Sequence, residues 1–197
     1  LASLAALPRD VPVAVPRGAL RAVPGLRRLR DRELIEVAPG DTVGVGDLVV
    51  EVVPAEHDGR RWPWSRRRAP AVGYVVSGES RTYFAGDTDS SAVVREAVGR
   101  CDIALLPVGG WGPTLGPGHL DAARAACFLA ELDAYHAVPV HFGTMWPVGL
   151  ELVRPGRFHR PGSEFVRQVA RRGLACSARE LQPGETAQFD LPERAAE

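Results

Sequence analysis

Cysteine is scarce in this sequence, and its arrangement argues against one class of protein. The three cysteines, Cys101, Cys127 and Cys176, are odd in number and widely spaced, and they include no close Cys-x-x-Cys pair. A small secreted domain held by disulfides is therefore not expected. The pattern favours a reduced, cytoplasmic setting in which the thiols act as small buried side chains.

Excess charge and long apolar runs are also absent. Lys+Arg and Asp+Glu both number 24, so no overall field attracts nucleic acid or an anionic membrane, and such a partner would have to be met locally. No apolar run approaches the roughly 18 to 20 residues of a membrane span. Residues 1–7 stop at Pro8 without a basic leader, which is typical of a helix tail rather than of a signal peptide.

An initiator methionine is missing too, because the chain starts at Leu1 and its only methionine is Met145. We therefore expect that residues have been lost from the N-terminus. The 197 residues are 45% hydrophobic. A chain of this size can bury roughly two-thirds of its unfolded surface, which is enough for one domain over residues 1–197.

The first half of the chain is patterned for strands. Residues 11–16 carry two prolines and suit an edge strand, and a helical turn is expected after Arg17. A β-meander is predicted over residues 33–37, 42–43 and 48–53. An arginine-rich loop is expected at residues 58–70, followed by a hairpin of strands 72–76 and 81–84.

The second half alternates helix and strand. Asp89 or Ser90 is predicted to cap a helix with Val93, Val94, Ala97 and Val98 on one face, and Asp121 to cap a second. The further predicted elements are strands at 103–106 and 137–140, a helix from Ser163 to Gly173, and short β segments at 177–181 and 186–189. The fold class is thus predicted to be α/β, with sheets in the middle and helices outside.

Three side chains of metal-ligand type each follow an apolar β-type run: His57 after residues 48–53, Asp87 after 82–86, and His141 after 137–140. Strand ends are held by a rigid sheet, so these groups can converge on one ion, and two imidazoles with a carboxylate make a plausible zinc set. Taken singly, each also suits an ordinary loop or turn residue.

His119 follows residues 110–118, a stretch with four glycines and two prolines, and directly precedes a helix. Such a backbone fits a shaped loop at a site, although His119 could simply begin the helix. His136 and His159 are expected to be non-catalytic. Arg60, Arg61 and Trp62 come directly after His57 and are candidates for substrate binding, since guanidinium groups pair with phosphate and indoles stack or enter lipid interfaces. A solvated basic loop is the alternative.

Together, these segments resemble the metallo-β-lactamase superfamily, in the branch of the ascorbate-phosphate lactonase-like proteins and N-acyl-phosphatidylethanolamine phospholipase D. The segments that carry the resemblance are residues 54–57, 84–88, 106–109, 119–125 and 138–144. The resemblance implies an αββα sandwich, two metal ions, usually zinc, and a metal-bound hydroxide that attacks an ester, lactone or phosphodiester. It also implies that His57 and His141 ligate the metals, that Asp87 bridges them, and that His119 assists catalysis.

The family's principal signature, His-x-His-x-Asp-His, does not occur in this sequence. We therefore expect that the parent protein is an active zinc-dependent enzyme and that its N-terminal strands and this metal motif have been cut away. The remaining chain is expected to bind metal weakly and to be inactive alone. Two alternatives stay open: a remnant that acts as a scaffold or interaction module, and an RNA-processing nuclease. The expected partner is a small-molecule or phospholipid-like substrate rather than nucleic acid, and homo-oligomerisation is left open.

Overall fold

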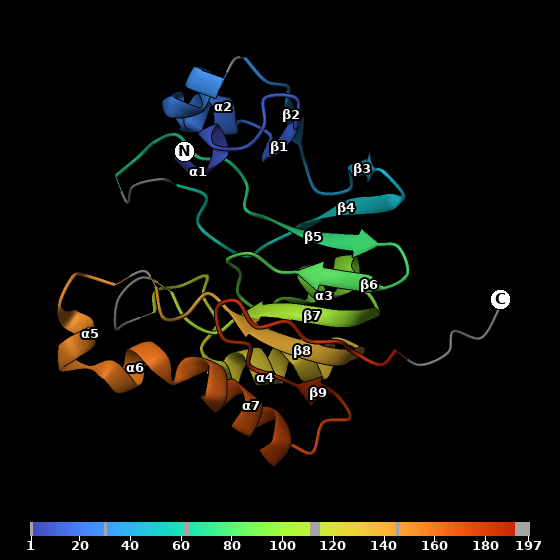
Figure 1. The fold of residues 1–197 in the computed structure, drawn as a ribbon, viewed down its shortest axis with the longest axis vertical. Helices are drawn as coiled ribbons and strands as arrows, with labels where there is room; N and C mark the ends of the chain where they lie inside the picture. The colour runs from blue at the N-terminus through green and yellow to red at the C-terminus, as the bar shows by residue number, and fades with distance from the viewer. Residues whose placement is uncertain (1, 30, 61–63, 111–114, 145, 192–197) are drawn as a thin grey trace.

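The computed structural model describes residues 2–29, 31–60, 64–110, 115–144 and 146–191 (Figure 1). The N-terminal elements are α1 (Ala2–Ala5), β1 (Val13–Pro16), α2 (Ala19–Ala22), the 3-10 helix η1 (Pro24–Leu29) and β2 (Leu34–Val37). The central elements are β3 (Thr42–Val45), β4 (Leu48–Pro54), β5 (Val72–Ser77), β6 (Arg81–Phe84), α3 (Ala92–Val98) and β7 (Cys101–Pro107). The C-terminal elements are α4 (Ala122–Glu131), β8 (Ala134–Val140), α5 (Leu150–Val153), α6 (Pro155–His159), α7 (Pro161–Arg171) and β9 (Ser177–Ala178).

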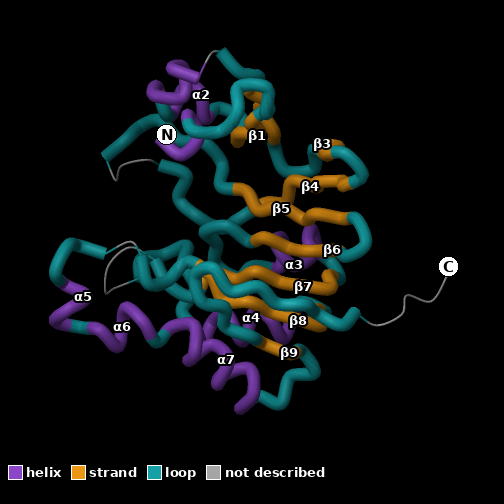
Figure 2. Tube along the Cα trace, in the orientation of Figure 1, coloured by secondary structure: helices purple, strands orange, loops and turns teal. Residues whose placement is uncertain are grey.

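A seven-stranded sheet in the order β3-β4-β5-β6-β7-β8-β9 forms the centre of the molecule (Figure 2). Strands β3 to β6 are antiparallel neighbours, which confirms the hairpin and the last two strands of the predicted meander, and β6 to β9 are parallel neighbours. Strand β2 does not join this meander. It pairs in parallel with β1 in a separate two-stranded sheet, because the intervening α2 and η1 return the chain to the same end.

Helices α3, α4 and α7 cover one face of the large sheet. Side chains that alternate along the strands, such as Val75, Tyr83 and Leu106, are buried beneath Phe128 of α4 and Phe165 of α7. This period of two is what a sheet with one covered face requires. On the opposite face Phe84 is 44% exposed. The predicted α/β class, with a central sheet and outer helices, is confirmed.

A second, smaller apolar cluster lies outside this core. Val15, Ala19, Leu26 and Leu29 pack together in residues 11–37, which we call the N-terminal lobe. The prediction that all 197 residues act as one domain stays a prediction. Among the described residues, no helix combines the length and apolar character needed to cross a bilayer.

Several local predictions shift when the fold is seen. Ser91, rather than Asp89 or Ser90, caps α3 by accepting a hydrogen bond from the Val94 N–H at 3.2 Å. Val93 is 60% exposed, since only the Val94 stripe faces the core. Asp121 caps α4 as predicted. Helix α7 begins at Pro161, two residues before Ser163, and residues 186–189 are not a strand.

The cysteines match their prediction only in part. All three are free thiols, which agrees with the absence of a disulfide framework. Cys101 is buried at the start of β7, Cys176 is half-buried, and Cys127 is exposed. The expectation of buried thiols is therefore wrong for Cys127, because its position on α4 faces away from the sheet.

Arg81, at the start of β6, forms a network of hydrogen bonds with its neighbours. Its guanidinium donates to both carboxylate oxygens of Glu51, at 2.6 and 3.2 Å, to Ser77 Oγ at 3.1 Å, and to the carbonyl oxygens of Val98 and Arg100. The hydrogen bonds from Arg81 hold the pKa of Glu51 below its ordinary value. This network therefore ties β4, β6 and the end of α3 together.

We expect Arg81→Ala to lower the free energy of unfolding by about 2 kcal/mol, measured by urea denaturation at neutral pH, because several charge-assisted hydrogen bonds are lost at once. The matched control is Arg95→Ala, which breaks an exposed ion pair with Glu131 and should cost about 0.5 kcal/mol or less. Arg81 lowers the folded-state pKa of Glu51. The stability that Arg81→Ala loses is therefore fully present above the unfolded-state pKa of Glu51, and it shrinks as the pH falls through the folded-state pKa. Equal costs for the two variants would contradict this assignment.

Candidate metal centre

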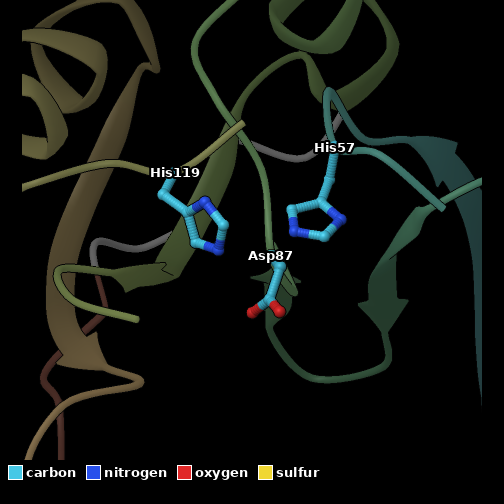
Figure 3. A group of neighbouring side chains, drawn as sticks. All are labelled: His57, Asp87 and His119. Carbon is cyan, nitrogen blue, oxygen red and sulfur yellow. The ribbon is translucent and has the colours of Figure 1, made fainter. Parts of the chain in front are cut away.

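Four of the predicted side chains meet at one edge of the large sheet. Strands β4, β6, β7 and β8 all point the same way, so their carboxyl ends lie together. His57 follows β4, Asp87 follows β6, and His141 directly follows β8. His119 approaches from the segment that leads into α4, and Figure 3 shows its ring facing that of His57, with Asp87 beside both.

The distances at this edge are short. One potential ligand atom each of His57, Asp87 and His119 lies within 4.8 Å of the others. The rings of His57 and His119 meet edge to face, with centroids 4.8 Å apart and an interplanar angle of 80°. His141 Nε2 lies 3.2 Å from Asp87 Oδ1. Asp87 thus lies next to all three imidazoles. However, the group whose ligand atoms are all within 4.8 Å of one another contains His119, whereas His141, predicted as a ligand with His57 and Asp87, contacts Asp87 from outside that group.

The donor set fits a zinc-type cation. Two ligands of a tetrahedral zinc with bonds of 2.0–2.1 Å are separated by roughly 3.3 Å. The 3.2 Å between His141 Nε2 and Asp87 Oδ1 matches that spacing. Three imidazoles and a carboxylate are also the nitrogen and oxygen donors that zinc accepts. The residues at this edge can thus hold such an ion.

Burial tunes one of the imidazoles. Desolvation lowers the pKa of His57, and the charge of the neighbouring His119 lowers it further, which outweighs the opposing effects of Asp87 and Asp58. A lowered pKa keeps the imidazole neutral near pH 7. Because only the neutral ring offers a lone pair, His57 is suited to bind a cation.

The backbone is unusual at His141. Its φ is 60°, and among the described residues it is the only one other than glycine with a positive φ. A non-glycine residue held there pays a conformational cost, and such positions cluster at functional sites. Gly109 makes room for it, because a Cβ at Gly109 would lie 2.7 Å from the His141 carbonyl oxygen. The end of β7 therefore sets where His141 sits.

Thr88 joins the segments that carry His57 and Asp87. Its hydroxyl is buried, accepts a hydrogen bond from the Glu56 N–H at 2.9 Å and donates to the Asp89 carbonyl oxygen at 2.8 Å. The Asp89 N–H donates in turn to the Glu56 carbonyl oxygen at 2.9 Å. The two chain segments are thereby fixed beside each other, one residue before His57 and one after Asp87.

Arg124 and Asp89 hold His119 in place, and sequence reasoning did not assign them this task. Arg124 donates one hydrogen bond to the His119 carbonyl oxygen at 2.9 Å and another to the Asp89 carboxylate. Burial raises the pKa of Asp89, but hydrogen bonds from Arg124 and from the N–H groups of Ser90 and Gly118 bring it below its ordinary value. Asp89 and Arg124 lie 35 residues apart, so no local spacing could have linked them.

The predicted substrate-binding residues are placed only in part. Arg60 pairs with Asp58 at 3.0 Å, while Arg61 and Trp62 lie outside the described residues. His136 contacts the Asp190 carbonyl oxygen from Nε2 at 2.8 Å, and the His159 ring meets Phe158 at 4.7 Å. Both of these imidazoles are thus engaged elsewhere in the fold.

A cavity of about 680 Å³ opens near the segments that carry His119 and His141. Its wall includes Gly110, Phe142 and Trp146, together with Arg157 and Arg160. The four metal-centre side chains do not line it, but Phe142 directly follows His141 and Asp121 lies two residues after His119, and both belong to the wall. A Cβ at Gly110 would lie 3.0 Å from the His119 ring, so that ring stands between the cluster and the cavity.

Gly118 allows the His57 and His119 segments to approach. Its φ is 81°, and a Cβ there would lie 3.1 Å from both the Glu56 carbonyl oxygen and His57 Cα. We expect Gly118→Ala to cost about 1–3 kcal/mol in thermal unfolding, because a left-handed backbone and a tight contact are both strained. Gly116→Ala is the control, since nothing lies within 4 Å of its Cβ. A Gly118→Ala protein as stable as the Gly116→Ala protein would refute the contact.

Comparison with known proteins identifies relatives of this chain. The model of the β-lactamase superfamily domain matches residues 1–142. A metal-dependent hydrolase of Aeropyrum pernix is 32% identical over 156 residues, which covers 77% of this chain and 55% of the relative. An N-acyl-phosphatidylethanolamine-hydrolyzing phospholipase D of Caenorhabditis elegans is 28% identical over 109 residues, covering 52% of this chain and 30% of that protein.

Solved structures share the fold. A metallo hydrolase of Ignicoccus hospitalis has a TM-score of 0.64 at 19% identity, with 92% of this chain and 70% of that chain covered. An isothiocyanate hydrolase from gut bacteria of Delia radicum has the same TM-score at 15% identity, with 96% and 71% covered. The first two curated relatives, from Pyrococcus furiosus and Aeropyrum pernix, are spanned over 62% and 55% of their length. Because the family model covers well over half of the sequence, the chain belongs to the metallo-β-lactamase superfamily.

Proposed function

We propose that this chain supplies the larger part of a metal-dependent hydrolase, with zinc as the metal and an ester, lactone or phosphodiester as the substrate. The observation that carries the proposal is the convergence of Asp87 with three imidazoles at the carboxyl ends of β4, β6 and β8. The Aeropyrum pernix relative, itself a metal-dependent hydrolase, supports the same reaction class.

The roles follow from position. His57 and His141 would hold the cations from opposite flanks, and Asp87 would bridge between them. Bound divalent cations would make water nucleophilic near neutral pH and stabilise negative charge on an anionic transition state. The Thr88 and Asp89 hydrogen bonds described above keep His57 and Asp87 in register for this task, which limits the reorganisation that the reaction needs.

We assign His119 to proton transfer, although its position beside His57 and Asp87 also allows it to bind a metal. The Pro117 carbonyl oxygen accepts a hydrogen bond from its Nδ1 at 3.3 Å, so Nε2 is left to exchange protons. The His119 ring packs close to Gly110, which lines the cavity. A leaving group placed in that cavity would contact the His119 ring. Protonation of a leaving oxygen by His119 is therefore the step we assign to it.

The cavity beside the site supports an anionic substrate with an apolar part. Phe142, Trp146 and Phe158 provide apolar surface, with the Trp146 and Phe158 rings meeting edge to face at 5.5 Å. Arg157 and Arg160 provide positive charge; of the carboxylates in the same wall, Glu164 pairs with Arg167 and Asp121 caps α4. A small molecule or a phospholipid-like substrate would suit such a wall. Arg60, Arg61 and Trp62 are kept as further substrate contacts, and a reducing cytoplasmic setting is consistent with the three free thiols.

The test combines metal content with hydrolysis. Zinc bound by the purified chain, and by the product of the gene with any upstream coding sequence, is measured by elemental analysis. Both proteins are then assayed with and without EDTA on bis(p-nitrophenyl) phosphate, p-nitrophenyl acetate and a simple lactone. We expect bound zinc and EDTA-sensitive hydrolysis of at least one compound by the longer product. Absence of both would refute the proposal and favour a scaffold without activity.

A further inference from the structure

A second candidate site lies away from the metal centre, where the β4–β5 loop meets the N-terminal lobe. A groove of about 410 Å³ is lined there by Arg21 and Arg27 of the lobe and by Arg66, Arg67 and Arg68 of the loop. None of the four metal-centre side chains contributes to its wall. Five arginines thus line one small concave surface.

The charge of this groove is not balanced by nearby carboxylates. Over the described part of the chain, none of the five arginines is within 4.0 Å of a carboxylate oxygen, whereas neighbouring cations such as Arg17 and Arg60 pair with Asp41 and Asp58. Glu36, which lies beside the groove, accepts the Gly18 N–H at 2.7 Å. Because the whole chain has equal numbers of basic and acidic residues, the concentration of positive charge is local.

The arginines are presented by an ordered turn. The Arg67 guanidinium donates to the Arg21 carbonyl oxygen at 3.3 Å, and Ser65 Oγ exchanges hydrogen bonds with the Arg67 backbone at 2.9 and 3.2 Å. Arg68 and Arg60 form an isolated antiparallel β-bridge through their backbones, and Ala69 packs against the apolar cluster of the lobe. The loop and the lobe therefore meet in a fixed arrangement, which reduces the ordering cost of binding.

We propose that this groove binds a small anion carrying two or more phosphate groups. Guanidinium groups bind phosphate oxygens through paired, charge-assisted hydrogen bonds, and several of them suit a ligand with several phosphates. The limited volume favours a small molecule over a nucleic acid, which would need an extended basic surface. The site does not depend on the proposed hydrolase activity, because it shares no residue with the metal centre.

The probe for this site is inorganic pyrophosphate, titrated calorimetrically without added divalent metal. We expect affinity to increase from phosphate to pyrophosphate to tripolyphosphate and to fall as the salt concentration rises. Arg21→Ala and Arg27→Ala should each weaken pyrophosphate binding on the order of tenfold. Arg28→Ala is the matched control, since Arg28 is exposed on the same 3-10 helix but does not line the groove. Thermal unfolding of each variant reports whether it remains folded.

A second control separates this site from the metal centre. Asp87→Ala should leave pyrophosphate binding unchanged if the groove is the site. A clear change of affinity in either direction would place the anion at the metal centre and overturn the inference. No binding at millimolar pyrophosphate, or equal loss in Arg28→Ala and Arg21→Ala, would also overturn it. If affinity instead increased with the length of a single-stranded oligonucleotide and exceeded that for tripolyphosphate, a nucleic-acid surface would replace the small-anion site.

Discussion

Replacing Asp87 with alanine is expected to lower zinc affinity by at least about 100-fold, measured by competition with a chromophoric chelator. Asp87 is the carboxylate at the centre of the cluster, with His141 Nε2 at 3.2 Å and the His57 and His119 ligand atoms within 4.8 Å. Its removal leaves three imidazoles with no carboxylate among them to offset the charge of a divalent ion. Loss of metal would carry loss of any metal-dependent hydrolysis with it.

Two controls sharpen the Asp87 experiment. Asp58→Asn removes a carboxylate next to His57 in sequence that is bound instead to Arg60, and it should leave zinc affinity nearly unchanged. Asp87→Asn keeps the shape of the side chain but not its charge, so its loss should approach that of Asp87→Ala. Zinc binding by Asp87→Ala at wild-type strength would refute the metal centre, whatever the activity of the protein.

His119→Gln is expected to reduce kcat of the metal-loaded enzyme by roughly 100- to 10,000-fold, while zinc affinity changes little. The expected split distinguishes two roles that the geometry allows, since His119 lies close enough to His57 and Asp87 to be a ligand. A proton donor affects the chemical step, and a ligand affects metal binding. Concurrent loss of zinc affinity and activity would therefore reassign His119 to the metal.

The controls for His119 use the residues that hold it. Arg124→Lys keeps the positive charge but not the fork that joins the His119 carbonyl oxygen to Asp89. It should lower kcat less than His119→Gln does, because the imidazole remains but is less well positioned. Substrates with a better leaving group should be less sensitive to His119→Gln, since they need less protonation. An equal loss on all leaving groups would contradict proton donation.

Much of the fold could be predicted from local patterns. Alternation of apolar residues identified strands near β4 to β8, because a half-buried strand repeats every two residues. The run at residues 77–80 marked the hairpin, and Asp121 marked the start of α4, since turns and caps depend on a few adjacent residues. Strand β2 was assigned to the wrong sheet, because its partner is chosen by contacts outside its own segment.

The candidate site divides along the same line. His57, Asp87 and His141 were identifiable because each directly follows a strand, and chain order with family resemblance supplied their roles. Thr88, Asp89 and Arg124 were not identifiable as supports, because the hydrogen bonds by which they join separate segments, Thr88 to Glu56 and Arg124 to Asp89, span 32 and 35 residues. The sequence showed that residues 66–68 are basic, but it did not show that they lie against the N-terminal lobe.

The order of helices and strands, and the kinds of side chain at the strand ends, were thus determined by the sequence itself, since propensity, capping and hydrophobic period act over a few residues. Tertiary structure alone decided that β4, β6 and β8 point the same way and bring three imidazoles around Asp87. It also decided that two distant arginine segments close one groove. Such arrangements depend on how buried faces pack together, and packing is a property of the whole chain rather than of any segment.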